Sequence, residues 1–243
     1  MPTALILGAG SDIAVAIARH FAGEKYDIQL AARKVDSLYP LQQDLQIRNQ
    51  VKVESFAFDA TDFDSHAAFY AGLPVKPDIT ICVFGYLGEQ EKAQANWSEA
   101  ARIIHTNYTG AVSILNIVAE DYAAKGAGTI VGISSVAGER GRQSNYIYGS
   151  AKAGFTAYLS GLRNRLFHKG VHVLSVQPGF VYTRMTEHLK LPALLTAQPQ
   201  QVAKDVYKAT VKKKNTLYTK WCWKYIMLII KSIPEGIFKK LKL

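Results

Sequence analysis

The stretch Gly8-Ala9-Gly10-Ser11-Asp12-Ile13-Ala14 follows the short apolar run Thr3–Leu7 and opens a segment of helical periodicity from 12 to 22. A strand that ends in a glycine turn and leads directly into a helix is typical of the first unit of a parallel α/β sheet. Glycine lets the backbone approach a phosphate there, and the helix N-terminus supplies N–H donors and a favourable dipole. Many such turns use glycine only to reverse the chain, so both interpretations stay open at this point.

Short apolar runs and helical segments alternate along the rest of the chain. Further buried strands are predicted at 27–31, 51–58, 78–84, 128–134, 171–177 and, more weakly, 216–219. Helices are predicted at 12–22, 35–48, 62–71, 98–124, 147–168 and 199–213. Repeated strand–helix–strand units give a parallel sheet covered on both faces. The predicted fold class is therefore α/β, a doubly wound parallel sheet of Rossmann-like type over residues 1–219, followed by a C-terminal amphipathic tail over 220–243.

The composition is that of a folded domain, and the charge is unevenly distributed. Of the 243 residues 49% are hydrophobic and 20% charged, which excludes intrinsic disorder, and two cysteines provide no disulfide framework. Residues 1–203 hold 18 basic and 17 acidic side chains, whereas 204–243 hold 11 lysines, no arginine and two acidic side chains. The net charge of +10 thus comes almost entirely from the tail and does not indicate a nucleic-acid-binding domain.

The spacing of four polar residues indicates a candidate catalytic site. Tyr148 and Lys152 are four residues apart on a predicted helix and therefore share one face. Ser135 ends the preceding strand, thirteen residues before Tyr148, and Asn107 lies in the helix that follows the fourth strand. A tyrosine beside a lysine can exchange protons near neutral pH if its pKa, ordinarily near 10, is lowered.

This ordered set resembles the short-chain dehydrogenase/reductase family, whose signature is an Asn, a Ser and Tyr-x-x-x-Lys. The match covers roughly residues 3 to 186 and includes Ile133-Ser134-Ser135, Tyr148-Gly-Ser-Ala-Lys152 and Gln177-Pro178-Gly179-Phe180-Val181-Tyr182-Thr183. Family spacing selects Ser135 rather than its neighbour Ser134. It also selects Tyr148 rather than Tyr146, since a serine stands four residues after Tyr146.

The resemblance implies that the protein interconverts a ketone and a secondary alcohol by hydride transfer. Tyr148 would be the acid in reduction and the base in oxidation, with its pKa lowered by Lys152 and the oxidised nicotinamide. Ser135 would orient the substrate oxygen, Lys152 would also hold the nicotinamide ribose, and Asn107 would position a water that returns the proton. The loop from 185 to 198 is expected to cover the substrate.

The nucleotide-binding residues depart from the family pattern at two places. Asp12 and Ala14 stand where the second and third glycines of the turn would be, and the charge of Asp12 must point away from a pyrophosphate. The usual Asn-Asn-Ala-Gly after the fourth strand is Cys82-Val83-Phe84-Gly85.

The second predicted strand ends Ala31-Ala32-Arg33, with alanine where an NAD-preferring enzyme carries a carboxylate. Arg33 can pair with a 2′-phosphate, so NADP(H) is the expected cofactor. The expected cofactor-binding residues are Gly8, Ser11, Asp12, Ile13, Arg33, Asp59, Gly85, Tyr148, Lys152, Pro178, Val181 and Thr183.

The tail carries a narrower resemblance. Together with Ser134–Arg142 and Gly85-Tyr-Leu-Gly88, it is similar to the reductase subgroup that includes decaprenylphosphoryl-2-keto-pentose reductases, which act on a lipid-linked sugar. Six apolar residues between Lys224 and Lys231 are too few to span a bilayer, which requires about 20. On a helix, Lys220, Lys224 and Lys231 form a stripe and apolar residues, Trp223 among them, cover most of the rest. This pattern predicts a helix lying in a membrane interface; packing on the domain or on a sister subunit is the alternative.

The start of the chain shows no features of a secretory signal, so we expect a cytoplasmic protein, peripheral on the cytoplasmic, inner-membrane surface. The expected partner is a ketone or secondary alcohol, lipid-linked if the narrower resemblance holds, and neither a metal nor a nucleic acid is expected. The family implies a homodimer or homotetramer through 98–124 and 147–168. Two alternatives remain: a reductase of a small soluble ketone whose tail serves oligomerisation, and a non-catalytic dinucleotide-binding protein.

Overall fold

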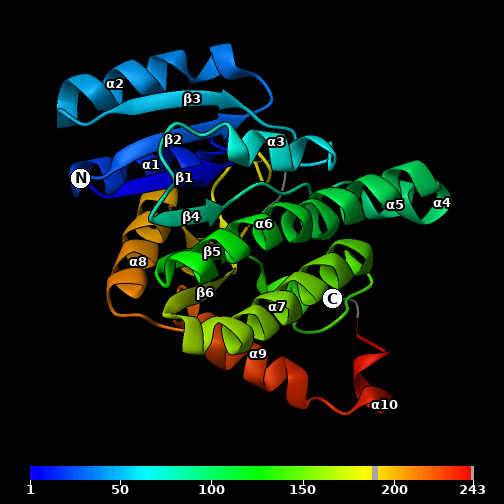
Figure 1. Ribbon diagram of the computed structural model, residues 1–243. Coiled ribbons are helices and arrows are strands. Elements are labelled where there is room, and N and C mark those ends of the chain that lie inside the picture. The colour runs from blue at the N-terminus through cyan, green and yellow to red at the C-terminus, as the bar shows by residue number, and fades with distance from the viewer. Residues whose placement is uncertain (188–190, 242–243) are drawn as a thin grey trace.

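The computed structural model describes residues 1–187 and 191–241, and its centre is a seven-stranded parallel sheet (Figure 1). The strand order is β3-β2-β1-β4-β5-β6-β9. The strands are β1 (Thr3–Leu7), β2 (Asp27–Ala32), β3 (Val53–Ala57), β4 (Ile79–Cys82), β5 (Gly128–Ile133), β6 (Val171–Pro178) and β9 (Thr216–Thr219). All seven predicted strands and the doubly wound α/β class are confirmed, although three strands are one or two residues shorter at an end than predicted, and β2 and β6 are each one residue longer.

Two layers of helices enclose the sheet. On one face pack α1 (Asp12–Gly23), α2 (Tyr39–Asn49) and α8 (Pro199–Val211); on the other pack α3 (Ser65–Ala71), α6 (Gly110–Lys125) and α7 (Tyr146–Leu166). Successive residues of β1 serve opposite layers, since Ile6 belongs to the first core and Leu5 and Leu7 to the second. Both faces are therefore buried, which explains the unbroken apolar strands.

Shorter elements connect or extend these layers. They are η1 (Val35–Leu38), α4 (Gln90–Ala95), α5 (Trp97–Ile104), η3 (Val136–Gly138), η4 (Phe167–Lys169), η5 (Ala193–Leu195), α10 (Glu235–Phe238) and a small two-stranded sheet of β7 (Phe180–Val181) and β8 (Thr196–Ala197). The prediction that 185–198 covers the substrate concerns a segment whose residues 188–190 lie outside the described part of the chain.

The predicted continuous helix 98–124 is wrong in its middle. Helix α5 passes into a π-helical turn, η2 (His105–Thr109), before α6 begins. At Gly110 the backbone approaches Ala60 so closely that a Cβ would stand 1.9 Å from the Ala60 carbonyl oxygen. Turns of this kind inside α-helices are frequent at functional sites, and this one contains Asn107.

The tail continues the domain through packed contacts. Helix α9 (Cys222–Ser232) buries Trp223 and Met227, which are 3% and 0% exposed, against Val136 and its neighbours. The Trp223 indole Nε1 donates to Leu195 O at 3.0 Å, and the ring occupies the space that a side chain at residue 179, a glycine, would need. The expectation that Trp223 lies among membrane-facing residues is therefore wrong, because that face of the helix fills a pocket in the protein.

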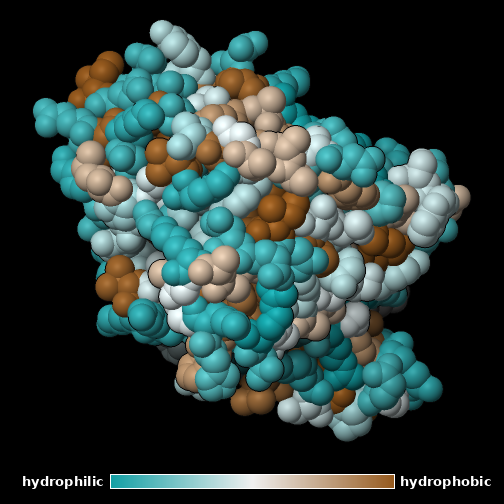
Figure 2. All heavy atoms as spheres, in the orientation of Figure 1, coloured by the Kyte–Doolittle hydropathy of each residue, from teal (hydrophilic) through white to brown (hydrophobic). Residues whose placement is uncertain are grey.

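The surface is mixed in polarity. On the face in Figure 2, hydrophobic residues are scattered among hydrophilic ones rather than gathered in one broad patch. Among the described helices, none is both long enough and apolar enough to cross a membrane.

Candidate active site

The predicted site residues gather at one edge of the sheet, where the parallel strands end. Gly8 follows β1, Gly85 follows β4, Ser135 follows β5 and Pro178 ends β6. The strand order reverses between β1 and β4, and ligands of doubly wound sheets bind in the crevice outside such a reversal.

Asn107 is fixed by the π-helical turn. Its Nδ2 donates to Tyr86 O at 2.6 Å and to Ile103 O at 2.8 Å, while Oδ1 accepts from Tyr86 N at 3.2 Å. The side chain is buried and tied on three sides. Asn107 thus ties the segment after β4, at Tyr86, to the end of α5, at Ile103.

Gly85 stands between two of the expected catalytic side chains. A Cβ at this position would lie 3.0 Å from Asn107 Oδ1 and 3.5 Å from Lys152 Nζ. The Lys152 ammonium is buried and donates to Ile133 O at 3.1 Å. Because residue 85 has no side chain, the polar ends of Asn107 and Lys152 share one small space at the strand ends.

Ser135 and Tyr148 lie beside this space. Ser135 caps η3, its Oγ accepting from Ala137 N at 3.1 Å, and it is close enough to the Tyr148 side chain to lower the pKa of that hydroxyl. Its neighbour Ser134 is turned inward, bonded to Lys152 O and to the Thr156 hydroxyl. The geometry therefore supports Ser135 as the serine of the set.

The fold also distinguishes Tyr148 from the alternative tyrosine, Tyr146. Tyr146 is 44% exposed at the start of α7, with its hydroxyl 3.4 Å from Gln94 Oε1. Tyr148 is directed inward instead, its ring centroid 5.8 Å from Lys152 Nζ. Only Tyr148 shares a site with the lysine.

Burial shifts the proton affinities of this pair in opposite directions. It raises the pKa of Tyr148 to about 12, against the opposing effect of the Ser135 hydrogen bond. It lowers the pKa of Lys152 to about 8, because the buried ammonium loses hydration. The expected lowering of the Tyr148 pKa by Lys152 is therefore not found in the protein alone, where desolvation is the largest effect and raises the pKa. In the protein alone, Tyr148 is a protonated donor at neutral pH.

The glycine turn fits a phosphate group. Gly8 has φ +89°, and a Cβ there would lie 2.7 Å from Phe84, so only glycine lets the two strand ends meet. Ser11 caps α1 by accepting from Ala14 N at 3.3 Å, and Ile13, half-buried, packs against the core. The turn therefore leaves the N-terminal N–H groups of α1 near the crevice.

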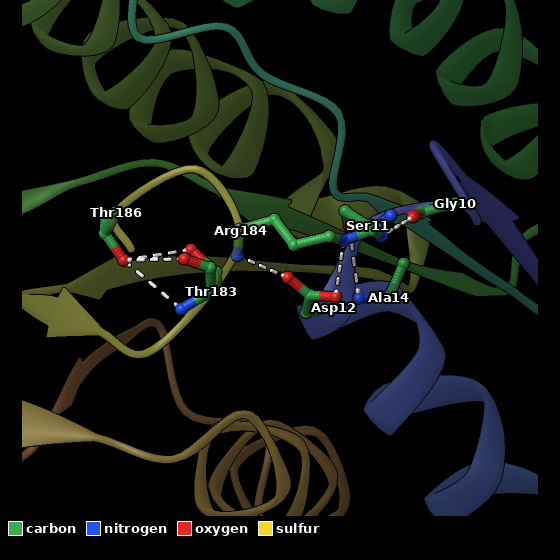
Figure 3. Close-up of polar contacts among 7 residues, drawn as sticks. All are labelled: Gly10, Ser11, Asp12, Ala14, Thr183, Arg184 and Thr186. Carbon is green, nitrogen blue, oxygen red and sulfur yellow. Dashed lines mark hydrogen bonds and ion pairs between the residues drawn. The ribbon is translucent and has the colours of Figure 1, made fainter. Parts of the chain in front are cut away.

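Asp12 has a partner that sequence reasoning missed. Arg184, in the turn after β7, donates from its backbone N to Asp12 Oδ2 at 2.7 Å and from Nε to Oδ1 at 3.0 Å (Figure 3). Its Nη2 also donates to Gly10 O at 2.6 Å. The two residues are 172 positions apart, and neither belongs to a local motif that would signal the pairing.

The remaining expected cofactor residues lie at both ends of the crevice. Arg33 is exposed just after β2. Burial would raise the pKa of Asp59, but two hydrogen bonds from Thr61 and, to a smaller extent, the charge of Arg33 hold it below its ordinary value. At the other end, Val181 is buried in β7, and the Thr183 hydroxyl lies 3.2 Å from that of Thr186. Within residues 1–187 and 191–241, no three His, Cys, Asp or Glu side chains gather as a metal site.

Comparisons with known proteins agree with this geometry. The family model described as short chain dehydrogenase matches residues 2–192. A Mycobacterium tuberculosis protein described as an uncharacterized oxidoreductase is 34% identical over 240 residues, covering 98% of this chain and 96% of its own. A similarly described Streptomyces coelicolor protein is 33% identical over 243 residues, covering 98% and 94%.

Solved structures share the fold. A short-chain dehydrogenase from Sphingobium yanoikuyae, in complex with NADPH, superposes with a TM-score of 0.81 at 23% identity, covering 97% of this chain and 98% of its own. An actinorhodin polyketide ketoreductase with NADPH gives a TM-score of 0.79 at 22% identity, covering 89% of this chain and 95% of its own. The chain belongs to the short-chain dehydrogenase family of oxidoreductases.

Proposed function

We propose that the protein is an NADP(H)-dependent reductase that interconverts a ketone and a secondary alcohol. The observation that carries the proposal is the convergence of Asn107, Ser135, Tyr148 and Lys152 on the space beside Gly85, at the sheet's strand reversal. The nicotinamide, when bound, supplies or accepts the hydride.

The chain's own residues manage the proton. Tyr148 stays protonated at neutral pH and donates to the carbonyl oxygen as it gains charge, while Ser135 hydrogen-bonds the same oxygen and orients it. Lys152, with its pKa near 8, carries a proton into the same space. The resting protonation of Tyr148 therefore suits reduction, and oxidation requires its pKa to fall when the cofactor's positive charge is present.

The preference for NADP(H) is proposed from the end of β2. Arg33 is exposed beside the crevice, and Ala32 leaves no carboxylate to hold ribose hydroxyls. Asp59, whose side chain accepts both Thr61 N–H and Thr61 O–H, shapes the next strand end. A 2′-phosphate would meet the exposed guanidinium of Arg33 there.

The reaction is tested with Tyr148→Phe, which keeps the ring and removes the acid. We expect NADPH affinity, measured by fluorescence, to stay within a few-fold, while single-turnover hydride transfer to a panel of ketones falls by about 10² or more. The matched control is Tyr146→Phe, which removes an exposed hydroxyl from the same helix. Near-normal transfer by Tyr148→Phe, or equal losses in both variants, would assign the chemistry elsewhere.

We further propose that the tail places this reaction at a membrane surface, on a lipid-borne ketone. Helix α9 buries one face and leaves another open. The exposed residues form the tail surface: Trp221, Tyr225, Leu228, Ile229, Ile237 and Leu241. Trp221 and Ile229 are 75% and 66% exposed. Unlike isolated exposed apolar residues, Leu228, Ile229, Ile237 and Leu241 line one shared hollow, and such clustering is typical of a surface that meets an apolar partner.

Lysine side chains give the tail surface a positive charge. Lys224, Lys239 and Lys240 are exposed around it, which favours an anionic lipid surface over a neutral protein partner. Two lysines of the expected stripe bind within the protein instead. Lys220 Nζ donates to Leu194 O at 2.7 Å, and Lys231 pairs with Glu139 at 2.6 Å.

The tail is also fixed to the loop that follows Ser135. Arg140 donates to Ile230 O at 2.6 Å and Ile233 O at 2.7 Å, and pairs with Glu235 at 3.0 Å. These bonds satisfy carbonyl groups at the end of α9. The tail surface therefore has a fixed position relative to the active site, as a docking element requires.

Membrane docking is tested by flotation with vesicles containing anionic lipid. Leu228→Glu combined with Ile229→Glu should abolish flotation of the full chain. The control, Ile47→Glu with Val75→Glu, changes two exposed apolar residues outside the tail and should float like the unmodified protein. Absence of flotation by the unmodified protein, or unchanged flotation of the tail variant, would refute this proposal. Truncation is unsuitable because it removes the buried Trp223 and Met227.

Association of two copies is proposed through α5 and α7. Trp97 is 74% exposed and Tyr146 is 44% exposed beside a hollow lined by both helices. Burying these rings in a second copy would account for their exposure. Sedimentation of the unmodified chain and of Trp97→Glu distinguishes this dimer from one made by the tail.

A further inference from the structure

The turn that would receive the cofactor's pyrophosphate carries a negative charge of its own. Asp12 is the first residue of α1, where the family pattern has glycine, and its carboxylate competes with a phosphate for the positive end of the helix. A free carboxylate here would repel the pyrophosphate. The chain must therefore compensate this charge.

Arg184 provides the compensation from the other side of the crevice. Its guanidinium meets both the Asp12 carboxylate and the Gly10 carbonyl, so it spans the turn from outside (Figure 3). Its backbone N–H binds the second carboxylate oxygen, which ties the main chain of the segment, and not only a flexible side chain, to α1. With this pairing the turn carries no net side-chain charge.

The segment held in this way directly follows the expected cofactor-binding residues Pro178, Val181 and Thr183. Thr183 lies immediately before Arg184, and Thr186 closes the same turn by accepting from Thr183 N at 3.2 Å and donating to Val181 O at 2.6 Å. An ordered Arg184 thus orders the neighbours of Thr183.

We propose that Asp12 and Arg184 form a charge-balanced strap that orders residues 183–187 over the phosphate-binding turn and keeps that turn receptive to the pyrophosphate. Arg184 is in this view a positioning residue, and the inference rests on the proposed cofactor site. For cofactor binding, the pairing matters because the Asp12 carboxylate would otherwise repel the pyrophosphate, whereas an unpaired Arg184 would not.

Charge arithmetic gives the test. Relative to the unmodified turn, Arg184→Gln leaves one negative charge, Asp12→Asn leaves one positive charge, and the double variant is neutral again. Arg184→Gln should weaken NADPH binding at least about tenfold at low salt. Asp12→Asn should bind as tightly as the unmodified protein or more tightly, and the double variant should return to within about threefold of it.

Salt and the unliganded protein provide two further readouts. The deficit of Arg184→Gln should shrink as ionic strength rises, because exposed charges are screened. In the protein without cofactor, amide hydrogen exchange of 183–187 should accelerate in Arg184→Gln. The control is Arg165→Gln, which removes an arginine that pairs with Glu120 near the C-terminal end of α7 and should change neither measurement.

The outcomes separate this inference from the proposed function. If the unmodified protein does not bind NADPH, the proposed cofactor is wrong and the strap has no ligand to serve. If it binds NADPH but Arg184→Gln binds equally well, or the double variant is as weak as Arg184→Gln, charge balance is refuted. Unchanged exchange of 183–187 in Arg184→Gln would refute the strap.

Discussion

Replacing Lys152 by methionine tests the buried site without any substrate or cofactor. Burial lowers the pKa of this ammonium from 10.5 to about 8. The unfolded chain therefore binds more protons than the folded chain between about pH 8 and 10.5, and stability rises with pH across that window. Below about pH 8 both states are protonated, and the full cost of burying the charge is present.

The magnitude follows from the two pKa values. At pH 7 the buried charge costs about 3 kcal/mol of stability, and at pH 9.5 about 1 kcal/mol remains, so the expected gain between these pH values is about 2 kcal/mol. Lys152→Met removes this titration, so its stability advantage over the unmodified protein should be largest at pH 7. Lys152→Arg keeps its charge over the whole range and should show no gain from this site.

The assay is urea denaturation of all three proteins at pH 7.0, 8.0, 9.0 and 9.5. Other groups titrate in the same range, so the informative quantity is the difference in unfolding free energy between variant and unmodified protein at each pH. That difference cancels the groups that the substitution leaves unchanged. A difference that is constant from pH 7 to 9.5 would show that Lys152 titrates as in the unfolded chain, and the argument from burial would fail.

Two further predictions concern Arg33 and Trp223. Arg33→Ala should reduce the NADPH-over-NADH preference in kcat/KM at least about tenfold, the equivalent of about 1.4 kcal/mol. The control Arg48→Ala, which removes an exposed arginine of α2, should leave the preference unchanged. Equal use of both cofactors by the unmodified enzyme would contradict this prediction. Trp223→Ala should lower the unfolding free energy by about 3–5 kcal/mol in urea titrations, because it empties a buried site. Trp221→Ala, at an exposed position two residues away, should change it by about 0.5 kcal/mol or less, and equal effects at both positions would show that α9 does not pack as described.

Local sequence was sufficient to predict the sheet and the candidate catalytic residues. Parallel strands buried on both faces require continuous apolar runs, and such runs are legible residue by residue, as in Thr3–Leu7. Tyr148 and Lys152 could be paired in advance because four residues make about one helical turn, whatever surrounds them. The preference for Ser135 over Ser134 also needed only spacing within one family pattern.

Tertiary structure decided everything that depends on segments distant in the chain. Helix α9 is apolar around most of its circumference, so periodicity could not tell which face would be buried. Only packing against Val136 and its neighbours selected Trp223 and Met227. Propensity gave no sign of the π-helical turn around Asn107, since tertiary packing produces it.

The proton affinities and the strap have the same origin. Lys152 was expected to lower the pKa of Tyr148, but desolvation, which no local pattern encodes, raises it to about 12 in the protein alone. From the sequence, Asp12 was a helix-start residue whose charge was unfavourable for a pyrophosphate. The fold pairs it with Arg184, which is 172 residues away in the sequence. Spacing along the chain fixes what one element can do by itself, whereas burial and partners between elements exist only once the sheet has closed.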